Sequence, residues 1–260
     1  MPMPYANLKT QHPGELDRKK LAKADYSFSS PFLLRLAHHE QALICEKVIR
    51  IIPGKRMVCF GSWNKLAIVA KIFFSRQAKE HIQRELKGAR LLISAKIPSP
   101  PLLHIDHTLD QTIHILIFER IQNAESLDSY WQKNKLSQAS ENSLHALTVE
   151  LATQHVLGVL QEDLHLKNFL VAAEKIYTLD GGSIRSHAKP LSKKQSLNNL
   201  ALFFSQLGIA NQYLQQQLFE TYVQARSWLI KKSDLLFLQK TLHNWNCTRW
   251  WNYSKKIFRS

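Results

Sequence analysis

The segment at residues 159–170 constrains the fold more than any other part of the chain, because it places polar side chains at fixed spacing between short apolar runs. Asp163 and Asn168 are five positions apart, and the apolar residues around them are typical of buried strands. Asp180 follows Asn168 by twelve positions, after a short strand-like run and before two glycines that permit an immediate turn. We therefore expect three polar side chains at the edge of one apolar core.

Two carboxylates and an amide in this order suit phosphoryl transfer. Asp163 would orient an attacking hydroxyl, while Asn168 and Asp180 would offer hard oxygen ligands to Mg²⁺ on the phosphates. The plain alternative is that Asp163 and Asn168 only cap neighbouring backbone, since short motifs often match by accident. Motifs elsewhere in the chain are needed to distinguish these two interpretations.

The run at residues 158–170, GVLQEDLHLKNFL, resembles the lipopolysaccharide kinase (Kdo/WaaP) family within the protein-kinase-like fold. The resemblance implies ATP and Mg²⁺ as cofactors and a sugar of the lipopolysaccharide inner core, Kdo or heptose, as the acceptor. It assigns a catalytic role to Asp163 and metal binding to Asn168 and Asp180. It also implies an α+β, bilobal fold with an N-terminal antiparallel sheet plus one helix and a mainly helical C-terminal lobe.

A lysine stands inside the apolar strand pattern at residues 66–74. The tripeptide that ends at Lys71 is similar to the V-A-x-K motif, whose lysine binds nucleotide phosphates and is held by a glutamate on a helix. Periodicity predicts that helix over residues 75–94, and Glu85 adjoins its apolar face of Ile82, Leu86, Ala89 and Ile93. Glu85 is the expected partner of Lys71. The alternatives are a lysine that reaches solvent and a solvated helix acid.

A hairpin is expected from strands at 43–52 and 57–60, with a second break at 61–65. The G-x-G-x-x-G run that covers phosphates in protein kinases is absent from the first turn. Gly54 still permits a tight turn, and Lys55 or Arg56 could contact phosphate directly as a charge-assisted bond. These three residues are the candidate nucleotide-binding turn.

Strand patterns at 102–105 and 113–118 lead to Glu119, where the resemblance implies a hinge whose backbone groups bind adenine. The later pattern is helical, with helices expected at 127–135, 143–157 (buried through Leu144, Leu147, Leu151 and Val156), 198–204, 214–231 and 233–244. The expected organisation is an irregular lead-in at 1–40 with helical turns near 32–39, an N-terminal lobe at 41–120, and a C-terminal lobe at 121–260.

Departures from the kinase pattern keep two rival functions open. The glycine run is missing, and Gln161 stands where kinases often carry His. A protein kinase that uses the same residues is one alternative, and a non-catalytic, pseudokinase-type binding protein is the other. His165 has two equal interpretations, as a group near the transferred phosphate or as a hydrogen-bonding residue that shapes the loop.

The charge balance indicates an anionic partner. Of 260 residues, 35 are Lys or Arg and 20 are Asp or Glu, which gives a formal net charge of +15. Such a surface attracts nucleic acid, anionic lipid or a phosphorylated glycolipid, and the absence of nucleic-acid-binding motifs disfavours the first. The resemblance implies lipopolysaccharide core or a lipid A precursor as substrate.

Location is predicted from the lack of a long apolar run or signal-peptide core, which favours a cytoplasmic protein. Its three cysteines, Cys45, Cys59 and Cys247, are predicted to be thiols. The chain from Trp245 onward interleaves aromatic and basic residues without acids, which suits docking on the inner face of the inner membrane. The alternative is that these rings pack the last helix onto the core.

Overall fold

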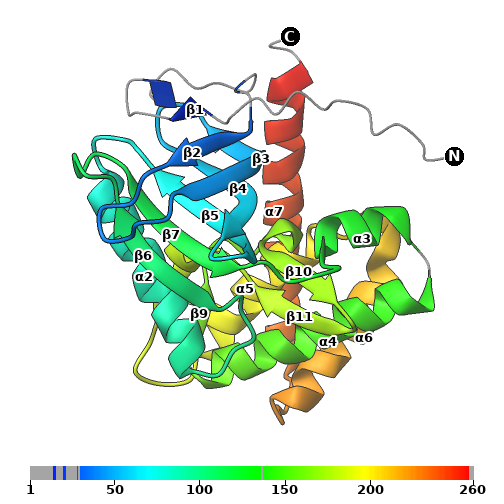
Figure 1. Ribbon diagram of the computed structural model, residues 1–260. Coiled ribbons are helices and arrows are strands. Elements are labelled where there is room, and N and C mark those ends of the chain that lie inside the picture. The colour runs from blue at the N-terminus through cyan, green and yellow to red at the C-terminus, as the bar shows by residue number, and fades with distance from the viewer. Residues whose placement is uncertain (1–13, 16–19, 22–27, 29, 136, 258–260) are drawn as a thin grey trace, which may run out of the picture. The chain divides into compact units, whose positions relative to one another are not determined.

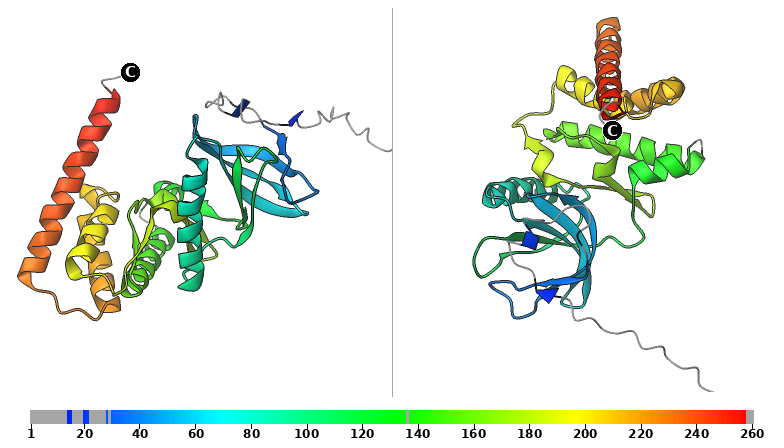
Figure 2. Two further views of the ribbon diagram at one scale, coloured as in Figure 1. Left: turned by 90° about the vertical axis from the view of Figure 1, so that its left-hand side faces the viewer. Right: turned by 90° about the horizontal axis from the view of Figure 1, so that it is seen from above.

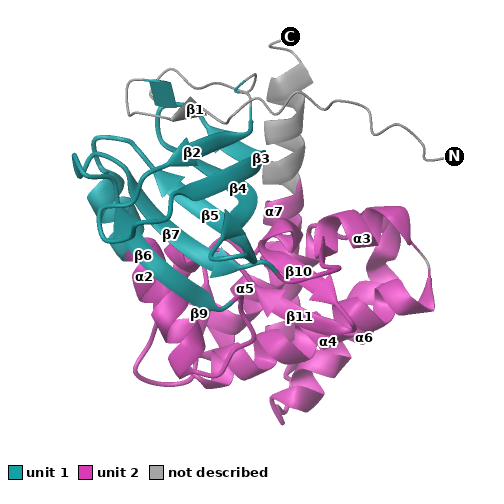
Figure 3. Ribbon diagram, in the orientation of Figure 1, with its two compact units in different colours: residues 1–83, 101–120 teal, residues 84–100, 121–260 magenta. Residues whose placement is uncertain are grey.

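The computed structural model describes residues 14–15, 20–21, 28, 30–135 and 137–257, and the side chains as far as residue 246. The side chains of the basic, tryptophan-rich tail beyond that point lie outside the described part. The chain divides into two compact units, drawn in teal and magenta in Figure 3. Unit 1 comprises residues 1–83 and 101–120, and unit 2 comprises 84–100 and 121–260.

Unit 1 is built on one seven-stranded sheet that is antiparallel except for its first, short pair (Figure 1). In spatial order its strands are β1 (Gly14–Glu15), β2 (Phe32–Leu34), β3 (Leu43–Ile52), β4 (Arg56–Trp63), β5 (Leu66–Phe73), β7 (His114–Glu119) and β6 (Leu102–His107). Alternate residues of β5, such as Ile68, Ala70 and Ile72, are fully buried, as the two-residue period of a strand requires.

Two local expectations in unit 1 were wrong. Helical turns were expected near residues 32–39, but Phe32 and Leu34 alternate with an outer residue as strand β2 and pair with β3. A break was expected at 61–65, but β4 continues to Trp63 and the turn is only Asn64 and Lys65. Both turn residues have positive φ, 50° and 64°, which is the conformation of a two-residue hairpin turn.

Unit 2 is mainly helical. Helix α2 (Ala78–Ser94) belongs to unit 2 from residue 84 onward. The other helices of unit 2 are α3 (Leu127–Lys133), α4 (Gln138–Val156), α5 (Lys193–Phe204), α6 (Gln212–Ala225) and α7 (Lys232–Ile257). Figure 2 shows α7 as one continuous helix. Its strands are β8 (Glu125–Ser126), β10 (Phe169–Ala172) and β11 (Lys175–Thr178) in one sheet, and β9 (Val159–Gln161) with β12 (Ile184–Ser186) in another.

The buried faces of two helices differ in part from the predicted ones. Leu144, Leu147 and Leu151 of α4 are buried as expected, but Val156 is 48% exposed. In α2 the exposed residue is Ile93, at 52%, because the neighbouring Leu92 packs inward instead.

Helix α5 starts before its predicted first residue, 198, because a capping box fixes its N-terminus. The Ser192 hydroxyl accepts a hydrogen bond from the backbone N–H of Gln195, and the side-chain oxygen of Gln195 accepts one from the backbone N–H of Ser192. The predicted helix at 214–231 instead ends at Ala225.

The predicted fold class is confirmed, since an antiparallel sheet with one helix precedes a mainly helical part. Cys45 and Cys59 are buried free thiols, as expected for these two, and a hydrogen bond to Cys59 together with burial raises the pKa of Cys45. Among the described residues, the structure contains no helix with the length and apolarity needed to cross a bilayer.

Candidate active site

The loop between β9 and β10 carries Asp163 and Asn168. Asn168 is 6% exposed, and its Nδ2 donates to the Asp163 carbonyl at 2.7 Å and to the Asp163 Oδ2 at 3.2 Å. Capping of local backbone is therefore part of its role. Because Nδ2 is used as the donor, Oδ1 is the atom that Asn168 can offer to a cation. The Asp163 side chain is 51% exposed, so a substrate can reach its carboxylate.

The same loop is held from the side by two further residues. His165 has Nε2 at 3.2 Å from Asp163 Oδ1 and Nδ1 at 3.3 Å from Gln206 Oε1. Gln206, just beyond α5, also accepts from the Leu166 amide at 2.9 Å and donates to the Leu164 carbonyl at 2.6 Å. No sequence pattern pointed to Gln206, whose partners lie about forty positions earlier.

A hairpin brings Asp180 towards Asn168. Strands β10 and β11 pair with Phe169 opposite Thr178, so the residues that flank the hairpin become neighbours. The Leu179 amide donates to the Asn168 carbonyl at 2.8 Å, and Asp180 follows at once. Asp180 has φ 59° and ψ 68°, a left-handed conformation that turns the chain sharply into Gly181.

Glu85 of α2 anchors the turn after Asp180. Its side chain is 1% exposed, and its two carboxylate oxygens accept from the amides of Gly181 at 3.0 Å and Gly182 at 3.1 Å. The alternative of a solvated helix acid is therefore wrong. One turn further along α2, a Cβ at Gly88 would lie 1.9 Å from the Gly181 carbonyl oxygen, so only glycine allows this approach. In the sequence, an isolated glycine within a helical pattern was the feature that could have indicated this close contact.

Behind the loop runs a buried polar chain that sequence reasoning missed. The Asn199 Nδ2 donates to the Gln161 carbonyl at 3.0 Å, and its Oδ1 lies 3.0 Å from His155 Nε2. His155 Nδ1 lies 2.7 Å from the Tyr222 hydroxyl, which accepts from Arg226 at 2.9 Å. Because Asn199 Oδ1 can only accept, Nε2 of His155 carries the proton and donates to it, and Nδ1 accepts from the Tyr222 hydroxyl. Burial lowers the pKa of His155 to about 4, so the ring is neutral.

The other candidate residues belong to unit 1. Lys71 lies in β5 opposite Leu116, on the face away from the core residue Ala70, with Nζ 5.4 Å from the Phe118 ring centroid. Its predicted contact with phosphate stays a prediction.

The turn between β3 and β4 has the shape expected of it. Gly54 has φ +66°, and the Lys55 amide donates to the Ile52 carbonyl at 3.0 Å. Arg56 begins β4 opposite Phe73. The turn is therefore tight, as predicted, and its phosphate contacts remain a prediction.

Glu119 ends β7, where its amide donates to the Pro101 carbonyl at 2.9 Å. That N–H is therefore already used within unit 1, and what its backbone can offer to adenine is the carbonyl oxygen. The adenine contact itself remains a prediction.

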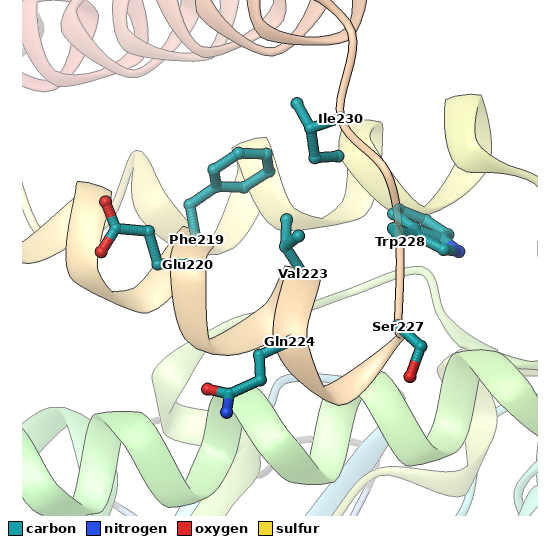
Figure 4. A pocket seen from close by; sticks show the side chains of 7 residues that line it. All are labelled: Phe219, Glu220, Val223, Gln224, Ser227, Trp228 and Ile230. Carbon is teal, nitrogen blue, oxygen red and sulfur yellow. The ribbon is translucent and has the colours of Figure 1, made fainter.

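One groove of about 500 Å³ lies on unit 2, along α6 and the segment that follows it (Figure 4). Phe219, Val223, Trp228 and Ile230 make it largely apolar, and Glu220 is its only acid. None of the candidate site residues lines it, so it does not mark the predicted chemistry.

An antiparallel sheet with one helix, followed by a helical part that carries an Asp-Asn loop and a further Asp, is the protein-kinase-like fold. Among solved structures, the chain is similar to that of WaaP in complex with acyl carrier protein, with 18% sequence identity and a TM-score of 0.51. The match covers 76% of this chain and 88% of the other. No family model matches the sequence, and no curated protein matches it. At this identity the likeness establishes the fold.

Proposed function

We propose that this protein is an ATP-dependent kinase that phosphorylates a sugar hydroxyl, Kdo or heptose, of the lipopolysaccharide inner core. The observation that carries the proposal is the arrangement in unit 2, where Asn168 is hydrogen-bonded to Asp163 and a hairpin brings Asp180 close to the same loop. The resemblance of residues 158–170 to lipopolysaccharide kinases and the fold likeness to WaaP support the substrate class. A net charge of +15 suits a phosphorylated glycolipid.

Asp163 is the proposed catalytic residue. Its carboxylate accepts the hydroxyl proton as the sugar oxygen bonds to the γ-phosphorus of ATP, while the bond from that phosphorus to the bridging oxygen breaks and ADP leaves. The hydrogen bond from Asn168 and the close approach of His165 restrict the orientations of the Asp163 side chain, which is half exposed. Since most of the rate comes from positioning, these neighbours matter as much as the carboxylate.

The donor set fits magnesium. Asn168 offers an amide oxygen and Asp180 a carboxylate, which are the hard ligands that Mg²⁺ prefers. Bound magnesium neutralises charge on the phosphates. Glu85 contributes by fixing the backbone next to Asp180 through the two glycine amides, which sets where the Asp180 carboxylate can lie.

The proposed nucleotide-binding residues lie in unit 1. Lys71 would hold the phosphates and pair with Glu85, the turn of Gly54, Lys55 and Arg56 would cover them, and the backbone at Glu119 would contact adenine. The tight turn at Gly54 and the position of Lys71 on the sheet face opposite the buried Ala70 support this assignment.

The test is transfer of labelled phosphate from ATP with magnesium, with core-containing lipopolysaccharide and a generic protein offered side by side. Asp163→Asn should lower transfer by roughly 10²–10⁴-fold, the range of a lost general base. The matched control is Glu162→Gln in the same loop. Glu162 forms a half-exposed pair with Arg185 at 2.9 Å, and such pairs contribute little.

Label on the glycolipid that disappears in Asp163→Asn and persists in Glu162→Gln would support the proposal. Label on protein alone would make the molecule a protein kinase. Nucleotide binding without transfer to either acceptor would make it a pseudokinase-type binding protein. Equal activity of Asp163→Asn and the natural protein would overturn the role of Asp163.

We further propose that the protein works in the cytoplasm and docks on the inner face of the inner membrane, where such a substrate is anchored. Sedimentation with anionic vesicles, before and after deletion of the chain from Trp250, tests this. Binding that survives the deletion would refute docking through the tail.

A further inference from the structure

A cluster of histidines surrounds one buried carboxylate in unit 1, and none of its members is a candidate residue of the proposed active site. Asp106 lies near the end of edge strand β6, and its side chain is fully buried. His38, on the connection between β2 and β3, and His107 each offer a ring nitrogen, and the three ligand atoms lie within 4.8 Å of one another. We propose that His38, Asp106 and His107 form a binding site for a divalent transition-metal ion of the Zn²⁺ class.

Hydrogen bonds orient the Asp106 carboxylate, as they commonly do for carboxylates that bind metal ions. Asp106 Oδ2 accepts from the His38 amide at 3.2 Å and faces His104 Nε2 at 3.3 Å, while Oδ1 accepts from the His107 amide at 2.8 Å. These hydrogen bonds reach both carboxylate oxygens and hold the group in a fixed orientation.

His107 has the tautomer that a ligand requires. Its Nδ1 lies 2.9 Å from the Thr108 carbonyl oxygen, which can only accept, so Nδ1 carries the proton. The lone pair is therefore on Nε2. A backbone carbonyl that orients the ring through its second nitrogen is the common support of zinc-bound histidines.

His38 supplies the mobile part of the site. Its side chain is 69% exposed, and Nδ1 lies 2.8 Å from Asp106 Oδ1. Ligand bonds of about 2.0–2.1 Å in a tetrahedron place ligand atoms about 3.3 Å apart. The ligand atoms lie within 4.8 Å of one another, at most about 1.5 Å more than this value, whereas His38 Nδ1 and Asp106 Oδ1, at 2.8 Å, would move apart. The exposed His38 ring can shift without disturbing the core. A fourth position would remain for water.

The position of the site gives it a structural role. In the sheet, β2 and β6 are separated by four other strands, and the Ala37 amide donates to the His107 carbonyl at 2.8 Å. The β2–β3 connection therefore meets the far edge of the same sheet. His38 and Asp106 are 68 positions apart, so a metal ion there would tie the two ends of the sheet together.

Two nitrogen ligands and one carboxylate favour zinc, cobalt or nickel over the hard cations Mg²⁺ and Ca²⁺. The site is thus chemically distinct from the all-oxygen set at Asn168 and Asp180, and a chelator experiment on phosphate transfer would not report on it.

The experiment is calorimetric titration of Zn²⁺ into the full chain, purified without a histidine tag and stripped with chelator. Because the chain has 12 histidines, the readout is a single tight site above weak background binding. We expect one Zn²⁺ per chain, a raised melting temperature, a visible absorption band when Co²⁺ replaces Zn²⁺, and no tight binding of Mg²⁺.

His38→Ala should weaken the tight site by about 100-fold or more, since loss of a ligand costs at least as much as loss of a supporting residue. Because the His38 ring is exposed, this substitution should leave the fold intact, and His107→Gln provides a second variant. His145→Gln in unit 2, whose ring is bonded to Thr221 at 2.8 Å, is the matched control and should bind Zn²⁺ normally. The absence of a saturable site, or a site that survives both ligand variants, would overturn the proposal and leave His38 and Asp106 as a simple ion pair.

Discussion

Acidification should destabilise unit 2 through His155, which is buried and neutral. Burial lowers its pKa most, a hydrogen bond to Asn199 opposes this, and the charge of Arg226 adds to the lowering. In the unfolded chain the pKa is about 6.5, and in the folded protein it is about 4. Below about pH 6.5 the unfolded chain binds a proton that the folded protein excludes, so the stability present at neutral pH is lost as the pH falls.

The magnitude follows from the two pKa values of His155. A unit of difference corresponds to about 1.4 kcal/mol, so lowering the pH from about 6.5 to about 5 should cost roughly 2 kcal/mol, and the full interval roughly 3 kcal/mol. The matched variant is His155→Gln, which keeps a side-chain amide near Asn199 but has no group that titrates in this range.

Urea unfolding, followed by the helical circular dichroism signal that comes mainly from unit 2, should be measured for both proteins at about pH 7.5, 6 and 5. The natural protein should lose roughly 2 kcal/mol relative to His155→Gln over this range. Acids outside the network, such as Glu150, whose pKa is raised by burial, titrate in both proteins and cancel. Parallel stability curves for the two proteins would refute the assignment of a neutral, proton-excluding His155.

Three further substitutions test the anchors of the loop. Gly88→Ala should lower the stability of the protein by about 1–3 kcal/mol, because the new Cβ would lie 1.9 Å from the Gly181 carbonyl oxygen. Alanine normally stabilises a helix relative to glycine, so thermal unfolding is compared with Lys87→Ala on the exposed face of the same helix. Gln206→Ala leaves two loop backbone groups without partners, so about 1–3 kcal/mol and most transfer activity should be lost, with the exposed Gln216→Ala unchanged in the same assays. Glu85→Gln puts a donating NH₂ where one glycine amide now donates, so transfer should need more Mg²⁺, and an unchanged Mg²⁺ dependence would contradict the anchoring role.

The sequence predicted the strands β3 to β7 of unit 1 and the shared loop of Asp163 and Asn168, because both depend on local patterns. Alternation along β3 to β5 marks strands, and a short spacing fixes which polar residues share a loop. The supporting residues could not be predicted, because Gln206 and Asn199 are ordinary polar residues until the fold joins them to backbone groups about forty positions earlier. Periodicity also cannot fix the edge of a buried face, which is why Ile93 was misassigned.

Glu85 has a second role in the predicted site, beyond the one that the kinase resemblance implied. The resemblance gave it one role, as partner of Lys71, whereas in the structure its carboxylate holds the turn after Asp180. The roles are compatible, because an ionised carboxylate has about four acceptor positions and the two glycine amides occupy two of them. A lysine that engaged Glu85 would therefore bind a group that is already hydrogen-bonded to the turn after Asp180, the proposed metal ligand. Placement of the nucleotide phosphates and placement of Asp180 would then depend on one side chain, and loss of Glu85 would disturb both even if unit 2 stayed folded.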